Sequence, residues 1–444
     1  MSEKQRFQAG FARVDISPEE SVPLAGYGNT SNRMSRTVMD PLYANCLAVT
    51  DEDGSTAVIM VLDLGNMYNP LPDIRAEVSR TLGLPMERVM ICCTHTHSAP
   101  HLSNGEKDSI PRYNEKLRRC MAEAALGALA DRKPAQMQAA SVQTAGLNFV
   151  RRYVLEDGTY AGDNYGHFKE SPIACHETEA DHQLQLIKFV REGGKDIVAA
   201  NFQGHPHRAG GSKKYEVTSD LVGVFRRTLE DSLSCHAMYF TGASGNVNCH
   251  SRIPEENITP NYIEHGKALA KYALEAAFAP VKTGKIRNIQ VMYEGKTNHT
   301  EDHLLSVAEE IKKVWTATGD GKECIRMGAP YGINSPYHAL SILNKSTLPE
   351  TMTVELNGIS LGDAALVFAP FELFDTLGMR IKENSPFDTT FVCCYANRVF
   401  SYMPTKLGFE HGGYGPNQCK FMPGTGEILA ERFLQILNRL HGGE

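Results

Sequence analysis

Alternation of strand-like and helix-like runs is the feature that most limits how this chain of 444 residues can fold. Short runs rich in β-branched and apolar residues predict buried strands, and runs whose apolar residues recur at i+3 and i+4 predict helices. Such alternation is typical of a sheet whose faces are covered by helices. The sequence therefore predicts an α/β fold with a mixed or mainly parallel sheet flanked by helices.

The predicted elements follow one another without an obvious break. Strands are expected over 55–63, 89–93, 197–202, 238–241, 364–369 and 390–395. Helices are expected over 72–82, from a cap at Asn114 to just before Pro134, behind Ser219 and Asp220, and over 262–278, 303–315 and 425–440. No linker rich in Pro, Gly or Ser divides the chain, so we expect residues 1–444 to form one domain.

Composition excludes several classes of protein. With 45 basic and 52 acidic residues the net charge is −7, so nucleic acid is not an expected partner. The longest apolar run, 364–371, is far shorter than the roughly 20 residues of a membrane helix, and no membrane span is expected. The N-terminal residues lack an apolar signal stretch, and eleven cysteines without a C-x-x-C pair favour reduced thiols. These features predict a cytoplasmic protein.

Histidines follow two of the predicted strands. His95 and His97 end one strand, and continued strand geometry would place both rings on one face. His205 and His207 end another strand, where His207 is interpreted as a surface loop residue. Because open α/β sheets bind ligands at strand carboxyl ends, we expect one shared site. At this point either both His95 and His97 bind a metal, or they divide ligand and acid–base roles.

An acidic residue interrupts an apolar stretch after the strand at 364–369. Glu372 stands in F-A-P-F-E-L-F, where a buried carboxylate needs a cap, an arginine or a metal as partner. The sequence contains no H-E-x-x-H, G-x-S-x-G or P-loop, and no G-x-G-x-x-G after a strand. Zincin, serine hydrolase and nucleotide-binding sites are therefore not expected.

Short motifs occur in a fixed order along nearly the whole chain. They are G-F-A-R-V-D-I-S-P at 10–18, L-A-G-Y-G at 24–28, D-P-L-Y-A at 40–44, T-H-T-H-S-A-P at 94–100, Arg151-Arg152, N-F-Q-G-H-P at 201–206, S-D-L-V-G at 219–223, P-F-E-L-F at 370–374, Y-M-P-T at 402–405 and G-G-Y at 412–414. In these motifs the chain resembles the catalytic domain of the neutral/alkaline (non-lysosomal) ceramidases, a family of zinc-dependent amidases. The T-H-T-H-S-A-P element is the most specific of them.

The resemblance implies a zinc site and the groups around it. The implied zinc ligands are nitrogen and oxygen donors, which suit that ion: His95, His205, Glu372 and Tyr402. The implied catalytic groups around the reacting carbonyl are His97, Arg151 and Tyr414. In this family pattern His97 is a catalytic partner and not a ligand, and the metal activates water for attack on a carbonyl.

Departures from the family pattern bear on the substrate. Where ceramidases have G-D-V-S-P-N, this chain has G-N-V-N-C-H at 245–250, so Asn248 takes the serine position as a substrate-binding residue. Gly415 follows Tyr414 where ceramidases have glutamate, and no immunoglobulin-like domain is expected after the catalytic one. We expect hydrolysis of a linear amide (N-acyl) bond in a soluble small molecule. Alternatives are an ester or lactone hydrolase with the same site, and a metal-binding homologue without turnover; the oligomeric state stays open.

Overall fold

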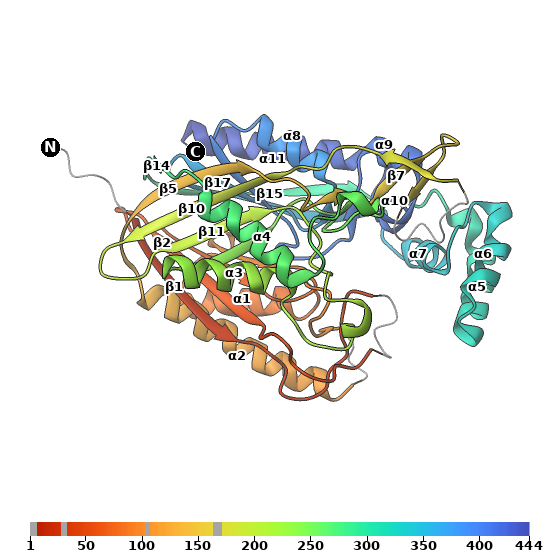
Figure 1. Cartoon of the computed structure of the whole chain (residues 1–444), viewed down its shortest axis with the longest axis horizontal. Coiled ribbons are helices and arrows are strands. Elements are labelled where there is room, and N and C mark those ends of the chain that lie inside the picture. The colour runs from red at the N-terminus through yellow and green to blue at the C-terminus, as the bar shows by residue number, and fades with distance from the viewer. Residues whose placement is uncertain (1–6, 28–32, 104–106, 163–170, 444) are drawn as a thin grey trace.

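Two β-sheets pack face to face between two layers of helices (Figure 1). The computed structural model describes residues 7–27, 33–103, 107–162 and 171–443. Between the sheets lies an apolar cluster to which Phe11 and Ile59 contribute from one sheet, and Leu366 and Phe391 from the other. The predicted α/β class with a mixed sheet flanked by helices is confirmed.

The larger sheet has nine strands in the order β12-β11-β10-β5-β1-β2-β3-β4, with β14 also paired to β5. Its strands are β1 (Phe7–Asp15), β2 (Tyr43–Thr50), β3 (Thr56–Leu62), β4 (Val89–Cys93), β5 (Lys133–Gln143), β10 (Gln183–Arg191), β11 (Ile197–Phe202), β12 (His236–Thr241) and β14 (Ala279–Val281). The pairs β3–β4 and β11–β12 are parallel, and the central pairs are antiparallel. Parallel pairing is thus confined to the two edges.

These two edges curl toward each other. Strand β12 contacts both β3 and β4, and the Thr241 hydroxyl at the end of β12 donates to the Thr94 carbonyl after β4 at 2.7 Å. Helix α3 (Asp220–Leu233) carries Arg226, whose guanidinium binds the Asp63 carboxylate at 2.8 and 2.5 Å. The carboxyl ends of β4 and β11 therefore lie close together although they are far apart in strand order.

The second sheet has four strands in the order β15-β16-β17-β19. They are β15 (Ile286–Lys296), β16 (Thr351–Leu361), β17 (Ala364–Phe368) and β19 (Thr389–Cys393). Helices α1 (Leu71–Leu82), α2 (Ser109–Ala130), α3 and α4 (Tyr262–Glu275) cover the larger sheet, and α8 (Asp375–Glu383) and α11 (Thr425–Gly442) cover the second (Figure 1). Each of these helices buries one apolar stripe against its sheet.

Three helices between β15 and β16 form a separate lobe beyond the end of the sheets (Figure 1). They are α5 (Leu305–Thr318), α6 (Gly321–Gly328) and α7 (Pro336–Ser346). This three-helix lobe has its own small core, which includes Ala308, Ile311 and Ile342.

Short strands, short helices and 3-10 turns lie in the connections between the main elements. The short strands are β6 (Phe149–Val150), β7 (Arg152–Leu155), β8 (Tyr160–Gly162), β9 (Ile173–His176), β13 (Val247–Asn248), β18 (Glu372–Leu373) and β20 (Tyr402–Met403). The short helices are α9 (Lys406–His411) and α10 (Tyr414–Gln418), with 3-10 turns at Met86–Arg88, Gly211–Lys213, Pro254–Glu256, Asp302–Leu304 and Ala329–Tyr331. In the described part of the chain, no helix has the length and apolarity needed to cross a membrane.

One helix boundary differs from the sequence prediction. Asn114 lies inside α2, which begins at Ser109, and its side-chain amide donates to the Leu102 carbonyl at 3.2 Å. The predicted cap was wrong because the apolar spacing used to place it marks the buried stripe, while the helix itself begins with the less periodic residues before that stripe. The stripe itself is buried as expected, with Leu117, Met121 and Ala124 in the core.

Candidate metal centre

Four side chains from four separate segments meet at the carboxyl ends of the strands. His95 follows β4, His205 follows β11, and Glu372 lies in β18, directly after β17. The Nε2 atoms of His95 and His205 are 3.1 Å apart, and the Oε2 atom of Glu372 lies 3.5 and 3.4 Å from them. Tyr402 pairs in register with Glu372 between β18 and β20. The structure thus brings together the four side chains that the sequence analysis named as ligands.

Backbone carbonyls determine which nitrogen of the His95 and His205 rings carries the proton. The Nδ1 atom of His95 contacts the Gly65 carbonyl, and Nδ1 of His205 lies 2.7 Å from the Ser244 carbonyl. A carbonyl can only accept, so both Nδ1 atoms carry hydrogen, and in the neutral rings both Nε2 atoms present lone pairs. Histidine ligands of metals are commonly held in this way.

His95, His205 and Glu372 offer one another lone pairs and no donor. Burial lowers the pKa of His95 and lowers that of His205 well below its usual value, so both rings are neutral at pH 7. The Glu372 Oε2 atom is buried and has no hydrogen-bond partner among the described residues. Two imidazole nitrogens and a carboxylate oxygen thus face one another without a proton between them. Such a set of electron-pair donors favours a bound cation.

Tyr402 adds a phenol to this cluster. Its hydroxyl accepts from Arg151 Nη2 at 3.1 Å. Burial, followed by the Glu372 charge, raises the pKa of Tyr402 well above its usual value. The phenol is therefore neutral by itself, and a cation beside it would be needed to favour the phenolate form. The donor set is compatible with zinc.

The His97 side chain also lies beside the His95 and His205 rings. Its Nε2 atom lies 3.1 Å from Nε2 of His95, and the ligand atoms of His95, His97 and His205 are all within 4.8 Å of one another. The predicted convergence of His95 and His97 is confirmed, but the predicted reason was wrong. Strand geometry ends at Cys93, and His95 has a left-handed backbone with φ of 67°.

Arg151 and Asn248 line the next part of the site. The Arg151 guanidinium is buried and donates to the Gly245 carbonyl at 2.7 Å and, at a longer 3.5 Å, to the Asn248 side-chain oxygen. Asn248 is held there because β13 pairs with β6, which directly precedes Arg151. Asn246, which stands where ceramidases have the aspartate of G-D-V-S-P-N, instead exchanges two hydrogen bonds with Asp375 at the start of α8. These two hydrogen bonds give Asn246 a structural role, away from the reacting groups.

Tyr414 stands at the start of α10. Its ring contacts that of Tyr402 edge-on with centroids 5.5 Å apart. Burial, then the charge of Glu372, raises the pKa of Tyr414 to about 12, so its hydroxyl keeps its proton at neutral pH. A side chain at Gly415 would meet the Phe374 ring at 2.9 Å, which excludes the glutamate that ceramidases have there unless that ring moves.

Several residues at the site had no signal in the sequence analysis. Tyr395 stacks on the His95 ring with centroids 4.0 Å apart, and its hydroxyl hydrogen-bonds Ser244 at 3.0 Å. His207, interpreted as a surface residue, is half-buried with its ring 5.4 Å from that of His97. Gly26 in the L-A-G-Y-G motif has φ of 108°, and a Cβ there would lie 2.5 Å from the His97 Cβ. Of these three residues, only Gly26 could have been found from the sequence, because it lies in the L-A-G-Y-G motif.

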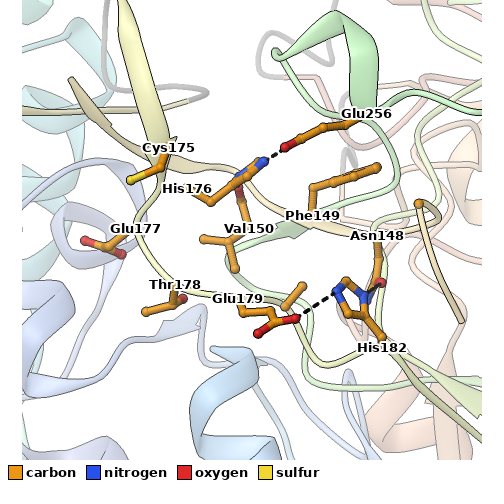
Figure 2. Close-up of a pocket in the computed structure, with 12 residues that line it drawn as sticks. Asn148, Phe149, Val150, Cys175, His176, Glu177, Thr178, Glu179, His182 and Glu256 are labelled. Atoms are coloured by element: carbon orange, nitrogen blue, oxygen red, sulfur yellow. Dashed lines mark hydrogen bonds and ion pairs between the residues drawn. The ribbon is translucent and has the colours of Figure 1, made fainter. Parts of the chain in front are cut away.

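A cavity of about 660 Å³ lies elsewhere, beside β6 (Figure 2). Its histidines are already engaged, because His176 contacts Glu256 at 2.7 Å and His182 contacts Asn148 at 2.7 Å. None of the predicted site residues lines this cavity. Figure 2 shows both rings turned toward these partners, so the cavity is not the candidate metal centre.

Comparison with known proteins supports the fold independently. The chain superposes on the crystal structure of neutral ceramidase from Pseudomonas aeruginosa with a TM-score of 0.73 and 18% identity, over 99% of this chain and 75% of that one. A structure described as ceramidase complexed with C2 gives a TM-score of 0.72 and 17% identity, over 99% and 76%. No protein-family model and no curated protein matches the chain. The chain therefore has the neutral ceramidase fold that the motifs predicted.

Proposed function

We propose that this protein is a zinc-dependent hydrolase that cleaves a linear amide bond in a soluble small molecule. One observation carries the proposal: the Nε2 atoms of His95 and His205 and the Oε2 atom of Glu372 face one another within 3.5 Å with no donor between them. Similarity in fold to neutral ceramidase supports the amide as the bond cleaved. We further propose that the whole chain is one catalytic domain.

The ligand set we propose is His95, His205, Glu372 and Tyr402. Zinc held by these side chains would lower the pKa of a coordinated water toward neutrality and polarise a carbonyl. The buried carbonyl contacts of His95 and His205 keep their rings oriented for this role.

The groups around the reacting carbonyl are Arg151, Tyr414 and His97. Arg151 is fixed by the Gly245 carbonyl, so its positive charge is oriented before the substrate arrives and stabilises the developing oxyanion. Tyr414 has its proton available as a hydrogen-bond donor at neutral pH, because its pKa is raised to about 12. His97 lies beside the ligand cluster without a carbonyl that fixes its Nδ1 atom among the described residues, which suits a proton-transfer role.

The first experiment combines metal analysis with a substrate panel. Protein purified without added metal should contain about one zinc per chain and hydrolyse short N-acyl compounds. Absence of any transition metal, even after supplementation with zinc, would refute the proposed centre. A kcat/KM higher for O-acyl compounds or lactones than for every amide would assign the protein to the ester or lactone alternative. Bound zinc with no turnover on any of these compounds would favour a non-catalytic homologue.

The second experiment concerns the substrate class. We expect long-chain ceramide to be a poor substrate, because Asn248 places an amide beside Arg151 where ceramidases have a serine hydroxyl. The comparison is kcat/KM for a fluorogenic long-chain ceramide in mixed micelles against soluble short-chain N-acyl compounds. A ceramide value equal to the best soluble value would contradict this expectation. We also propose a cytoplasmic location, which the eleven free thiols support.

A further inference from the structure

One pair of aromatic rings lies at the candidate centre and a second pair on the three-helix lobe. The inner pair is Tyr402 and Tyr414, with ring centroids 5.5 Å apart. The outer pair is Tyr337 of α7 and Trp315 of α5, with centroids 5.9 Å apart and an edge-on geometry. Trp315 is the single tryptophan of the chain, so any change in its surroundings can be observed alone.

A side-chain contact joins the two helices that carry Tyr414 and Tyr337. Gln418 on α10 donates from Nε2 to the Tyr337 carbonyl at 3.1 Å. Tyr414 and Gln418 are four residues apart in α10 and therefore share a helix face. The face of α10 that carries Tyr414 is thus the face that meets the start of α7. Tyr337 also contributes to the raised pKa of Tyr414, after burial and the Glu372 charge.

A buried cluster of polar groups keeps the lobe fixed against α10. Lys345 is only 3% exposed, and its Nζ atom donates to Glu301 at 2.6 Å and to the Asn417 carbonyl at 3.2 Å. The Ser341 hydroxyl donates to the same carbonyl at 2.7 Å. Helices α7 and α10 are therefore joined by short contacts from side chains that are almost fully buried, Lys345 and Ser341, and the outer ring pair has a defined place relative to Tyr414.

The outer pair of rings is partly exposed to solvent, whereas the inner site is buried. Tyr337 is 38% exposed and Trp315 half-buried, whereas His95, His205 and Arg151 are buried. Small-molecule sites typically combine a few convergent polar groups with apolar and aromatic walls. We propose that Tyr337 and Trp315 form the outer part of the substrate site and bind a hydrocarbon group, aryl or short alkyl, of the amide substrate. This inference rests on the proposed function for the identity of the reaction.

Binding is tested without turnover by the fluorescence of Trp315. Phenylacetate should change the emission in a saturable way, and acetate should not. In Tyr337→Ala we expect about tenfold weaker phenylacetate binding, while Tyr337→Phe should bind normally because the ring remains. Tyr331→Ala is the matched control, because Tyr331 is a 52% exposed tyrosine on the same lobe. Equal phenylacetate affinity in Tyr337→Ala and the wild type would overturn the proposal.

Turnover provides the second readout. For amides that carry a phenyl group on either side of the scissile bond, Tyr337→Ala should raise KM about tenfold and leave kcat unchanged, since the ring contributes binding away from the reacting atoms. For N-acetyl methylamine neither constant should change. A fall in kcat with both substrates would show a structural role and overturn the proposal. Saturable phenylacetate binding in a protein that hydrolyses nothing would refute the proposed function and leave the subsite standing.

Discussion

His97 differs from His95 and His205 in how its ring is held. The Nδ1 atoms of His95 and His205 donate to the carbonyls of Gly65 and Ser244, which leaves Nε2 as the only position open to a metal. The Nδ1 atom of His97 is buried and has no hydrogen-bond partner among the described residues. A ring without a fixed tautomer can carry a proton on either nitrogen, which a fixed ligand cannot do.

This difference predicts opposite results for two alanine variants. His95→Ala should lose zinc and activity together, because it removes a fixed ligand. His97→Ala should keep the zinc and lower kcat about 10²- to 10⁴-fold, the usual size of a general acid–base contribution. Zinc content by elemental analysis is measured beside kcat on the same preparations. If His97→Ala loses zinc as readily as His95→Ala, then His97 is a ligand and the assignment of roles must be reversed.

Among single residues, the sequence identified those whose side chains are themselves typical metal ligands. His95, His205 and Glu372 could be selected because histidine and carboxylate after strand ends are recognisable on their own. Tyr402 came only from the family resemblance, and Tyr395 was not found at all. An aromatic residue that stacks on a ligand has the same apolar appearance as one in the core, so only the tertiary contact at 4.0 Å distinguishes it.

Between elements, the joint of α7 and α10 depends on one carboxylate. Glu301 is bound by His338 at 2.7 Å and by Lys345 at 2.6 Å. Burial raises the pKa of Glu301, but the contacts with His338 and Lys345 lower it by more, so that the resulting pKa is about 2. A carboxyl whose pKa is lower in the folded than in the unfolded state stabilises the fold above pH 4.5 and loses that effect as the pH falls toward 2.

We therefore expect Glu301→Gln to be less stable than the wild type by on the order of 2 kcal/mol at pH 6, with allowance for its 26% exposure. The difference should shrink progressively between pH 4.5 and pH 2 as the wild-type carboxyl takes up its proton. Urea unfolding followed by Trp315 fluorescence reports on the lobe directly. Glu310→Gln, at an exposed pair on α5, is the control and should show no such pH dependence. A difference that does not vary with pH would contradict the assignment.

Elements with strong local patterns were predicted well, and their partners were not. Strands β4, β11 and β17 were placed within a residue or two, because each is a short continuous apolar run. The long antiparallel strands β15 and β16 were missed because one side of each is partly exposed, so polar residues interrupt the apolar run. Helix α7 was missed as well, since its buried residues include Ser341 and Lys345, which pattern analysis reads as solvent-facing.

In the whole molecule, the site exists because the two edges of the larger sheet meet. His95 follows β4 at one edge, and His205 follows β11, next to the other edge. Strand order depends on contacts between residues far apart in the chain, so no local pattern contains it. The expected meeting of the two histidine clusters was correct, but it assumed the strand ends of one open sheet. The structure reaches the same result by curling a nine-stranded sheet.

The Asp63–Arg226 pair holds these edges together. Asp63 follows β3, Arg226 lies on α3 beside β12, and both side chains are almost fully buried, at 0% and 2% exposure. Removing one partner of a buried ion pair leaves an uncompensated charge, so Asp63→Asn should destabilise the protein by about 3–5 kcal/mol. The double variant Asp63→Asn/Arg226→Met should recover part of this loss, because no buried charge is left unpaired.

The effect should extend to the metal centre, and that distinguishes closure of the sheet from a general loss of stability. In folded Asp63→Asn protein, competition with a chelator should remove zinc more readily than from the wild type, because the ends of β4 and β11 are less firmly held. Glu20→Gln breaks the exposed pair with Arg112, 45% and 62% exposed, and should change unfolding by less than about 1 kcal/mol with normal zinc retention. Unfolding within 1 kcal/mol of the wild type for Asp63→Asn, or unchanged zinc retention in it, would mean that other contacts close the sheet, the Thr241 to Thr94 hydrogen bond first among them.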